Sequence, residues 1–152
     1  MQRNNKQLAI PDTASVVKVR VLYIDTDQSG VAYHGAYLRW LEAGRGNYMR
    51  RRGVPYLQVE QSGLLFPVIE AHVEYLRPAA YDDVVEVTAW ISEFGGAQVR
   101  FDYVISRGEE ALIKGYTRHA AVGENGRPTR LPDAIKQALS GPEKTDMAKE
   151  LA

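Results

Sequence analysis

The stretch Tyr23-Ile-Asp-Thr-Asp-Gln-Ser-Gly-Val-Ala-Tyr-His-Gly-Ala-Tyr37 joins an alternating apolar segment to a segment with helical periodicity. Two carboxylates, Asp25 and Asp27, stand near its start, and His34 follows Asp27 by seven residues. Ser29-Gly30 supplies a turn between them, because glycine tolerates backbone angles that other residues avoid. A strand-to-helix connection does not need so many reactive groups in order to fold. We therefore treat this loop as the candidate functional site.

The residues of the loop allow two interpretations. In the functional one, a carboxylate faces the amino end of a helix, where N–H groups without internal partners can polarise a substrate carbonyl. In the structural one, an Asp-rich turn only caps the helix, and His34 is a partly exposed loop residue. The two are compatible, since one aspartate can cap the helix while the other acts on a substrate.

The segments on either side of the loop predict a strand and a long helix. Residues 17–21 alternate valine with a basic residue, which is the period of a half-buried strand. Over 36–51 the pattern predicts a helix with one apolar stripe, made of Tyr37, Trp40, Leu41, Gly44 and Tyr48. Gly44 costs about 1 kcal/mol of helix propensity against alanine, which predicts a close approach to a sheet. The run 50–52, all arginine, is interpreted as a solvated helix end.

The rest of the chain predicts four more strands joined by turns. We expect short helices over 55–63 and 132–139, and strands over 64–75, 85–91, 99–105 and 111–122. Hairpin-linked strands are antiparallel, and the striped helix can bury its apolar face only against the sheet. The expected class is α+β, a curved antiparallel five-stranded sheet wrapped around one long central helix. We expect one domain over 15–139, a flexible tail over 1–14 and a second tail over 140–152.

The composition excludes several classes of function. Lys+Arg and Asp+Glu both number 19, and this balance argues against nucleic acid or a membrane surface as partner. The absence of cysteine excludes disulfides, thiolate zinc sites and a cysteine nucleophile, and it fits a reducing compartment. The histidines have no metal-like spacing, so no metal site is expected, and His72 and His119 are interpreted as sheet residues. No apolar run approaches the ~20 residues that span a bilayer, and no signal peptide is evident. We expect a cytoplasmic protein.

The element order and the loop together resemble the hot-dog fold, in particular the 4-hydroxybenzoyl-CoA thioesterase family with its YbgC-like acyl-CoA thioesterases. The matching residues are the quoted loop, Trp40-Leu-Glu-Ala-Gly-Arg45 and Val73-Glu-Tyr-Leu-Arg-Pro-Ala-Ala-Tyr-Asp-Asp-Val84. The likeness runs from about Val16 to about Pro132. It implies hydrolysis of an acyl-CoA thioester, without a metal or organic cofactor, and an aromatic lining from Tyr37 and Trp40 would suit a short-chain or aromatic acyl group. It also implies a homodimer that pairs into a homotetramer, with sites at subunit interfaces.

The same resemblance implies roles for residues of the loop. Asp27 is the catalytic carboxylate, as nucleophile or as general base, and His34 is the second active-site residue. The position of Asp25, two residues before Asp27, instead suggests a structural role in holding the loop. Backbone N–H groups near the helix start polarise the thioester carbonyl, and the residues that form this part of the pocket are Gly30, Tyr33, Gly35 and Tyr37.

The chain departs from the family where the CoA nucleotide is held. The benzoyl-CoA enzyme carries a basic cluster at a hairpin, whereas the matching Ser92-Glu-Phe-Gly-Gly-Ala-Gln98 has none. Arg77, Arg100 and Arg118 are therefore the candidates for the CoA phosphates, although Arg100 also fits an ordinary surface position of a strand.

Two other classes of function remain open at this level. Hot-dog domains also act as hydratases or dehydratases on acyl-thioesters, and some could bind acyl-CoA without catalysis. The spacing of Asp27, Gly30 and His34 favours hydrolysis over the first class. Pure binding does not require these three residues, which counts against the second.

Overall fold

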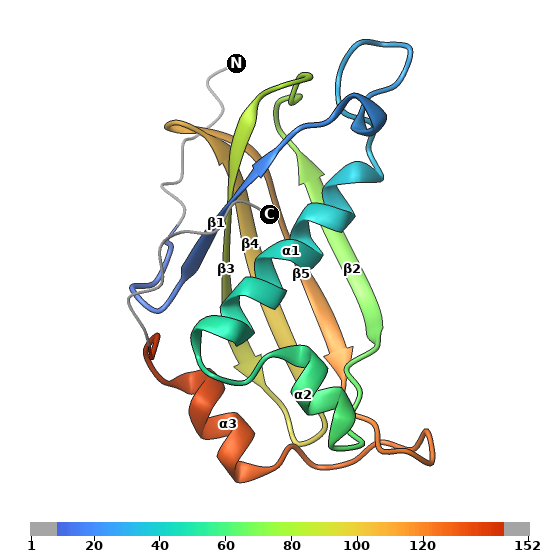
Figure 1. The fold of residues 1–152 in the computed structure, drawn as a ribbon, viewed down its shortest axis with the longest axis vertical. Coiled ribbons are helices and arrows are strands. Elements are labelled where there is room, and N and C mark those ends of the chain that lie inside the picture. The colour runs from blue at the N-terminus through green and yellow to red at the C-terminus, as the bar shows by residue number, and fades with distance from the viewer. Residues whose placement is uncertain (1–8, 145–152) are drawn as a thin grey trace.

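The helix α1, Ala36–Arg51, crosses one face of a five-stranded antiparallel sheet (Figure 1). The computed structural model describes residues 9–144, and expectations for 1–8 and 145–152 lie outside the described residues. The strands are β1 Ser15–Arg20, β2 Val68–Tyr75, β3 Val84–Phe94, β4 Gln98–Arg107 and β5 Glu110–Ala120, in the order β1-β3-β4-β5-β2. The other helices are a single 3-10 turn η1 Tyr23–Asp25, α2 Tyr56–Gln61 and α3 Asp133–Ser140. The predicted α+β architecture is confirmed.

The apolar stripe of α1 is the face that packs on the sheet. All five predicted stripe residues are buried, among them Trp40 and Leu41 at 0% exposure. A Cβ atom added to Gly44 would lie 2.6 Å from Cγ1 of Val87 on β3, closer than any side chain tolerates. The predicted close approach of Gly44 to the sheet is therefore confirmed, and this contact limits how near helix and sheet can lie.

The helix covers the sheet unevenly. It packs chiefly on β1 and β3, and less on β4. The edge strand β2 lies beyond that contact (Figure 1), and all of its residues except Val73 are exposed. The part of the sheet formed by β5 and β2 is thus only partly covered on the helix side. Within residues 9–144, no helix is long and apolar enough to cross a bilayer.

The strand predicted over 64–75 begins only at Val68. Pro67 precedes it and has no N–H to donate to a ladder, and Leu65 makes only an isolated bridge to Val122. The apolar residues of this segment serve the core instead, since Leu64 and Phe66 are buried.

The interpretation of the arginine run as a solvated helix end is wrong for Arg51 and Arg52, which are buried, whereas Arg50 is exposed. Arg52 is only 1% exposed. Its guanidinium donates to Ser15 Oγ at 2.7 Å and to the Gly141 carbonyl at 3.0 Å. Arg51 Nε lies 2.6 Å from Glu143 Oε1. A buried guanidinium has five N–H donors to satisfy, and segments distant in sequence provide the acceptors.

The packed part of the chain extends beyond the predicted domain bounds of 15–139. The N–H of Lys144 donates to the Arg51 carbonyl at 2.8 Å, so residues 141–144 lie against the end of α1. On the other side, the Thr13 carbonyl accepts a hydrogen bond from Arg52. Neither bound could be read from composition, because both depend on the buried arginines.

The two glycines of α1 provide a matched test of the helix–sheet contact. We expect Gly44→Ala to lower the free energy of unfolding, because overpacking costs ~1–3 kcal/mol and exceeds the ~1 kcal/mol gained in helix propensity. Gly46→Ala should instead raise stability, since the only atom near its added Cβ is Nη1 at the end of the Arg50 side chain, at 3.3 Å. Urea denaturation of both variants checks this, and equal effects would contradict the proposed contact.

Candidate active site

The loop between β1 and α1 is a tight turn tied to a distant part of the chain. The N–H of Gly30 donates to the Asp27 carbonyl at 3.0 Å, and the N–H of Asp27 donates to the Val31 carbonyl at 3.1 Å. Gly30 has φ +83°, a value that favours glycine. Ala32 N–H donates to the Ala79 carbonyl at 2.8 Å. The position of the turn is therefore set by the segment that follows β2.

Asp27 is an exposed carboxylate held from one side only. Ser29 donates to its Oδ1 through the backbone N–H at 2.8 Å and through the hydroxyl. These bonds hold the pKa of Asp27 below its ordinary value, and the nearby His34 lowers it further. The side chain is thus ionised at neutral pH. Among residues 9–144 no donor bonds to Oδ2, which is left to face solvent.

Asp25, two residues earlier, has the opposite environment. Its side chain is 4% exposed. The carboxylate accepts a hydrogen bond from the Leu22 N–H at 2.8 Å and forms an ion pair with Arg39 of α1. The backbone carbonyl of Asp25 also accepts the N–H of Tyr33 at 2.8 Å. Asp25 therefore joins the start of the loop to the helix, in line with the structural role that the sequence suggested.

His34 and Gly35 lie where the loop enters α1. The exposed ring of His34 packs edge-on against the ring of Tyr33, with 5.2 Å between the centroids. The backbone carbonyl of His34 accepts a hydrogen bond from the Tyr75 hydroxyl at 2.7 Å. A Cβ on Gly35 would lie 2.1 Å from the Tyr33 hydroxyl, so only glycine fits there. Among residues 9–144 the amide N–H groups of His34 and Gly35 bond to no acceptor, and both are available to a ligand.

Of the other predicted pocket residues, Tyr33 lies at the surface and Tyr37 lies in the core. The N–H of Tyr33 is already used by Asp25, so Tyr33 offers only its half-exposed side chain. Tyr37 is 2% exposed. Its hydroxyl accepts the Ala79 N–H at 3.0 Å, and its ring packs on Trp40. Tyr37 therefore supports the loop from inside the core and lines no open surface.

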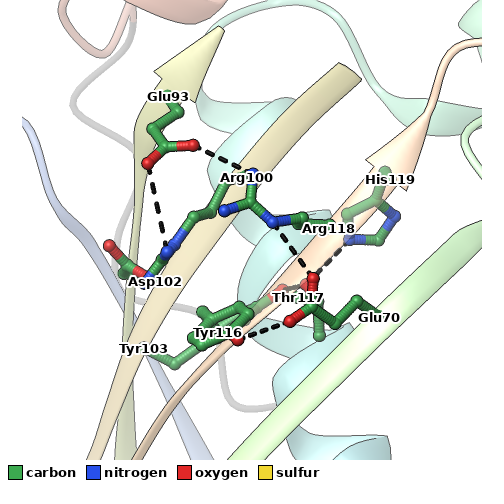
Figure 2. Close-up of polar contacts among 9 residues, drawn as sticks. All are labelled: Glu70, Glu93, Arg100, Asp102, Tyr103, Tyr116, Thr117, Arg118 and His119. Carbon is green, nitrogen blue, oxygen red and sulfur yellow. Dashed lines mark hydrogen bonds and ion pairs between the residues drawn. The ribbon is translucent and has the colours of Figure 1, made fainter. Parts of the chain in front are cut away.

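The three arginines expected to hold CoA phosphates are not gathered at the loop. Arg100 and Arg118 stand on the sheet face opposite α1, as Figure 2 shows. Arg118 pairs with Glu93 at 2.9 Å and Glu70 at 3.1 Å, and Arg100 pairs with Asp102 at 3.0 Å. A phosphate on this face would have to compete with these carboxylates.

The remaining candidate, Arg77, is exposed at the end of β2. Its Nε lies 3.5 Å from Glu110 Oε1, and both side chains are well solvated. An ion pair of this kind contributes little to stability. Arg77 is thus the candidate whose guanidinium is most easily released to another anion.

Sequence reasoning missed a buried polar cluster on the inner face of the sheet, formed by Tyr103, Thr117 and His119 (Figure 2). Thr117 Oγ1 lies 2.6 Å from the Tyr103 hydroxyl and 2.8 Å from His119 Nε2. His119 Nδ1 lies 3.0 Å from the Phe66 carbonyl. Burial lowers the pKa of His119 to about 4, so the ring is neutral at pH 7. Alternation shows which residues of one strand share a face, but not which residues of two strands meet.

Comparison with known proteins places the chain in a family. The profile of the thioesterase superfamily matches residues 29–114. The acyl-CoA thioesterase YbgC of Haemophilus influenzae is 33% identical over 123 residues, which cover 80% of this chain and 90% of that protein. The chain belongs to the thioesterase superfamily.

Solved structures agree with this membership. A hypothetical protein of Thermus thermophilus superposes with a TM-score of 0.80 at 38% identity, over 83% of this chain and 97% of that one. A mutant of 4-hydroxybenzoyl CoA thioesterase, complexed with 4-hydroxybenzoyl CoA, superposes with a TM-score of 0.76 at 20% identity, over 84% and 99%. The second match shows the shared fold alone. The hot-dog fold inferred from the loop is confirmed.

Burial of His119 gives a pH dependence that can be measured. Between its ordinary pKa of 6.5 and about 4, the unfolded chain binds a proton at this residue and the folded chain does not. Stability should therefore rise with pH across that window and be fully present above it, by roughly 3 kcal/mol at ~1.4 kcal/mol per unit. Urea denaturation from pH 4 to 7 should show a flatter dependence in His119→Gln. His72→Gln, at an exposed position of β2, should keep the wild-type slope.

Proposed function

We propose that this protein is an acyl-CoA thioesterase that hydrolyses a short-chain or aromatic acyl-CoA to the free acid and CoA. The carrying observation is the arrangement at the amino end of α1, where an ionised, exposed Asp27 stands near His34 and two unbonded amides. Membership of the thioesterase superfamily supports the reaction type. The named relative YbgC acts on acyl-CoA, which supports CoA as the thiol carrier. The absence of cysteine supports a reducing, cytoplasmic location.

In the proposed reaction the thioester carbonyl binds at the N–H groups of His34 and Gly35. These donors stabilise the negative charge that develops on the carbonyl oxygen. Asp27 either attacks the carbonyl carbon, forming an anhydride that water then hydrolyses, or takes a proton from the attacking water. In both routes the C–S bond breaks and CoA leaves as the thiolate. His34 orients water or Asp27 by hydrogen bonding.

The second part of the proposal is a homodimer, paired into a homotetramer, whose subunits complete the site. In a single chain Asp27 and His34 are open to solvent, whereas efficient hydrolysis requires a site that controls the access of water. Exposed apolar residues surround the loop, including Tyr23 at 77% and Ile24 at 85%. Among the described residues, β2 pairs only with β5, so its outer edge offers ladder groups that a second copy can satisfy.

The two aspartates provide the main test of the reaction. Asp27→Asn removes the charge but keeps the shape, and kcat should fall by on the order of 10²–10⁴. Asp25→Asn should act mainly through stability, because Asp25 is buried against Arg39. The activities of both variants can be measured as the release of free thiol from a panel of acyl-CoAs and carrier-protein thioesters. Wild-type activity in Asp27→Asn, with a folded but inactive Asp25→Asn, would show that the wrong carboxylate was chosen.

His34 should contribute less to the rate than Asp27. The carboxylate of Asp27 already supplies the nucleophile or the base in the proposed reaction, which leaves His34 the role of orienting a partner by hydrogen bonding. We expect His34→Ala to lower kcat less than Asp27→Asn does, and His34→Asn to recover part of the loss by restoring a hydrogen-bond donor. If His34→Ala is as inactive as Asp27→Asn and asparagine restores nothing, His34 is a principal catalyst.

The assembly can be tested at the edge strand. Sedimentation equilibrium at micromolar concentration should show a dimer or tetramer, and Ile69→Lys on β2, whose side chain is 53% exposed, should shift it toward the monomer. Leu57→Lys on α2, at 65% exposure, is the matched control and should leave assembly intact. A wild-type protein that sediments only as a single chain would refute this part.

A further inference from the structure

The hydroxyl of Tyr75 joins the end of β2 to the entry of α1. It donates a hydrogen bond to the backbone carbonyl of His34 at 2.7 Å, across 41 residues of sequence. Figure 1 shows the end of β2 beside the first turn of α1. The carbonyl belongs to the peptide group between His34 and Gly35. The N–H of that group is one of the two amides of the candidate site that bond to no acceptor among residues 9–144.

The bond to the carbonyl also determines where the N–H of Gly35 points. A peptide group is planar, and this one is trans. In a trans peptide the C=O and the N–H point in opposite directions. Because the carbonyl of His34 is directed at the Tyr75 hydroxyl, the N–H of Gly35 is directed away from it. A thioester carbonyl that accepts this N–H must therefore approach from the side opposite Tyr75.

Gly35 leaves the peptide group with little local constraint. A side chain is excluded there, because an added Cβ would lie 2.1 Å from the Tyr33 hydroxyl. Glycine has the widest choice of backbone angles, so sterics alone do little to prevent the whole peptide group from rotating between His34 and Gly35. Such a rotation would turn the N–H away from the substrate. The hydrogen bond from Tyr75 opposes it.

Tyr75 is itself held by the core and by the sheet. Its ring packs edge-on against the ring of Tyr37, with 5.3 Å between the centroids, and Tyr37 is buried and accepts the Ala79 N–H. Its backbone pairs with Ile113 of β5. Partial burial, together with the neighbouring Tyr37 and Tyr33, raises the pKa of Tyr75 above its ordinary value. The hydroxyl therefore stays protonated at neutral pH and remains a donor.

We propose that Tyr75 is a positioning residue of the thioesterase site, which orients the Gly35 N–H toward the substrate carbonyl through its bond to the His34 carbonyl. The inference rests on the proposed function, since these amides would stabilise the negative charge that develops on the substrate oxygen. The same bond also strengthens the donor. Hydrogen bonds in series polarise one another, so donation to the His34 carbonyl makes the Gly35 N–H a better donor. Tyr75 needs no contact with the substrate to act in this way.

Removal of the Tyr75 hydroxyl should lower kcat and leave KM nearly unchanged. Tyr75→Phe keeps the ring that packs on Tyr37, and the position is 49% exposed, so we expect the variant to fold. The loss in kcat should be about three- to tenfold, which corresponds to one neutral hydrogen bond. It is limited because the His34 N–H belongs to the preceding peptide group. A donor whose contribution grows as the oxygen becomes charged acts on kcat more than on KM.

Tyr48→Phe is the matched control for this test. The Tyr48 hydroxyl also donates to a backbone carbonyl at 2.7 Å, that of Leu139, in the second half of α1 and away from the loop. This variant should lose stability and keep the wild-type kcat, measured by thiol release where circular dichroism shows a folded protein. Wild-type kcat in folded Tyr75→Phe, or an equal loss in both tyrosine variants, overturns the inference. A large loss in Asp27→Asn would then still support the proposed function.

An NMR measurement examines the peptide group without requiring hydrolysis. The chain contains a single His-Gly pair, so histidine labelled at the carbonyl carbon and glycine labelled at nitrogen give one correlation, from His34 and Gly35. In Tyr75→Phe both resonances should move to lower frequency, because the carbonyl loses its hydrogen bond, whereas Tyr48→Phe should leave them in place. Unchanged resonances in folded Tyr75→Phe overturn the inference. If they move but the wild-type protein releases no thiol, the orientation of the peptide group is supported and the proposed function is refuted.

Discussion

The packing of α1 on the sheet is the constraint on which the rest of the structure depends. Gly44 allows the helix to lie directly against Val87, and this contact determines where the first turn of the helix stands relative to β1. The loop then has a fixed distance to span. Asp25 closes that span, because it joins the start of the loop to Arg39 of the helix. A change in the helix–sheet distance would therefore shift Asp27 and His34 even though neither residue lies at the helix–sheet contact.

Two carboxylates of the same loop have different environments, and the difference suggests their roles. Asp25 is buried and has its acceptor positions used by the Leu22 N–H and Arg39. Asp27 is exposed and bonded from one side by Ser29, which keeps it ionised with one oxygen open. A buried, paired carboxylate holds a structure together, whereas an open, ionised one can react. The proposed reaction requires both, because Asp27 would act from a position that Asp25 fixes.

The uneven cover of the sheet links a cavity with the proposed assembly. Because α1 lies toward β1 and β3, the sheet near β5 and β2 has, within residues 9–144, a partly open face and an edge strand paired on one side only. A cavity of about 670 Å³ occupies part of that face, and the side of α1 that carries Arg39, Arg45 and Met49 lines it. A second subunit at the β2 edge would enclose the same region.

The sequence by itself determined the order of elements and the class of fold, and it identified the loop that we propose as the active site. These follow from local regularities: the two-residue period of strands, the stripe on α1, and the fixed spacing of Asp27, Gly30 and His34. It also indicated the role of Gly44, since a glycine on an apolar stripe leaves room for a neighbouring element to approach the helix backbone. The same patterns predict a start of β2 four residues too early, because the buried apolar residues before Val68 have the composition of a strand without its pairing.

Only the tertiary structure decided which distant groups meet. The sequence pattern predicts that Arg52 is solvated, whereas in the structure it is buried and donates to Ser15 and Gly141. The sequence pattern predicts that His119 is an ordinary strand residue, whereas in the structure both of its ring nitrogens have buried partners, Thr117 and the Phe66 carbonyl. Arg45 belongs to a cavity only because α1 leaves part of the sheet open. The physical reason is common to all three: the energy of a buried charge or hydrogen bond depends on partners far away in the chain, which local patterns of hydrophobicity do not encode.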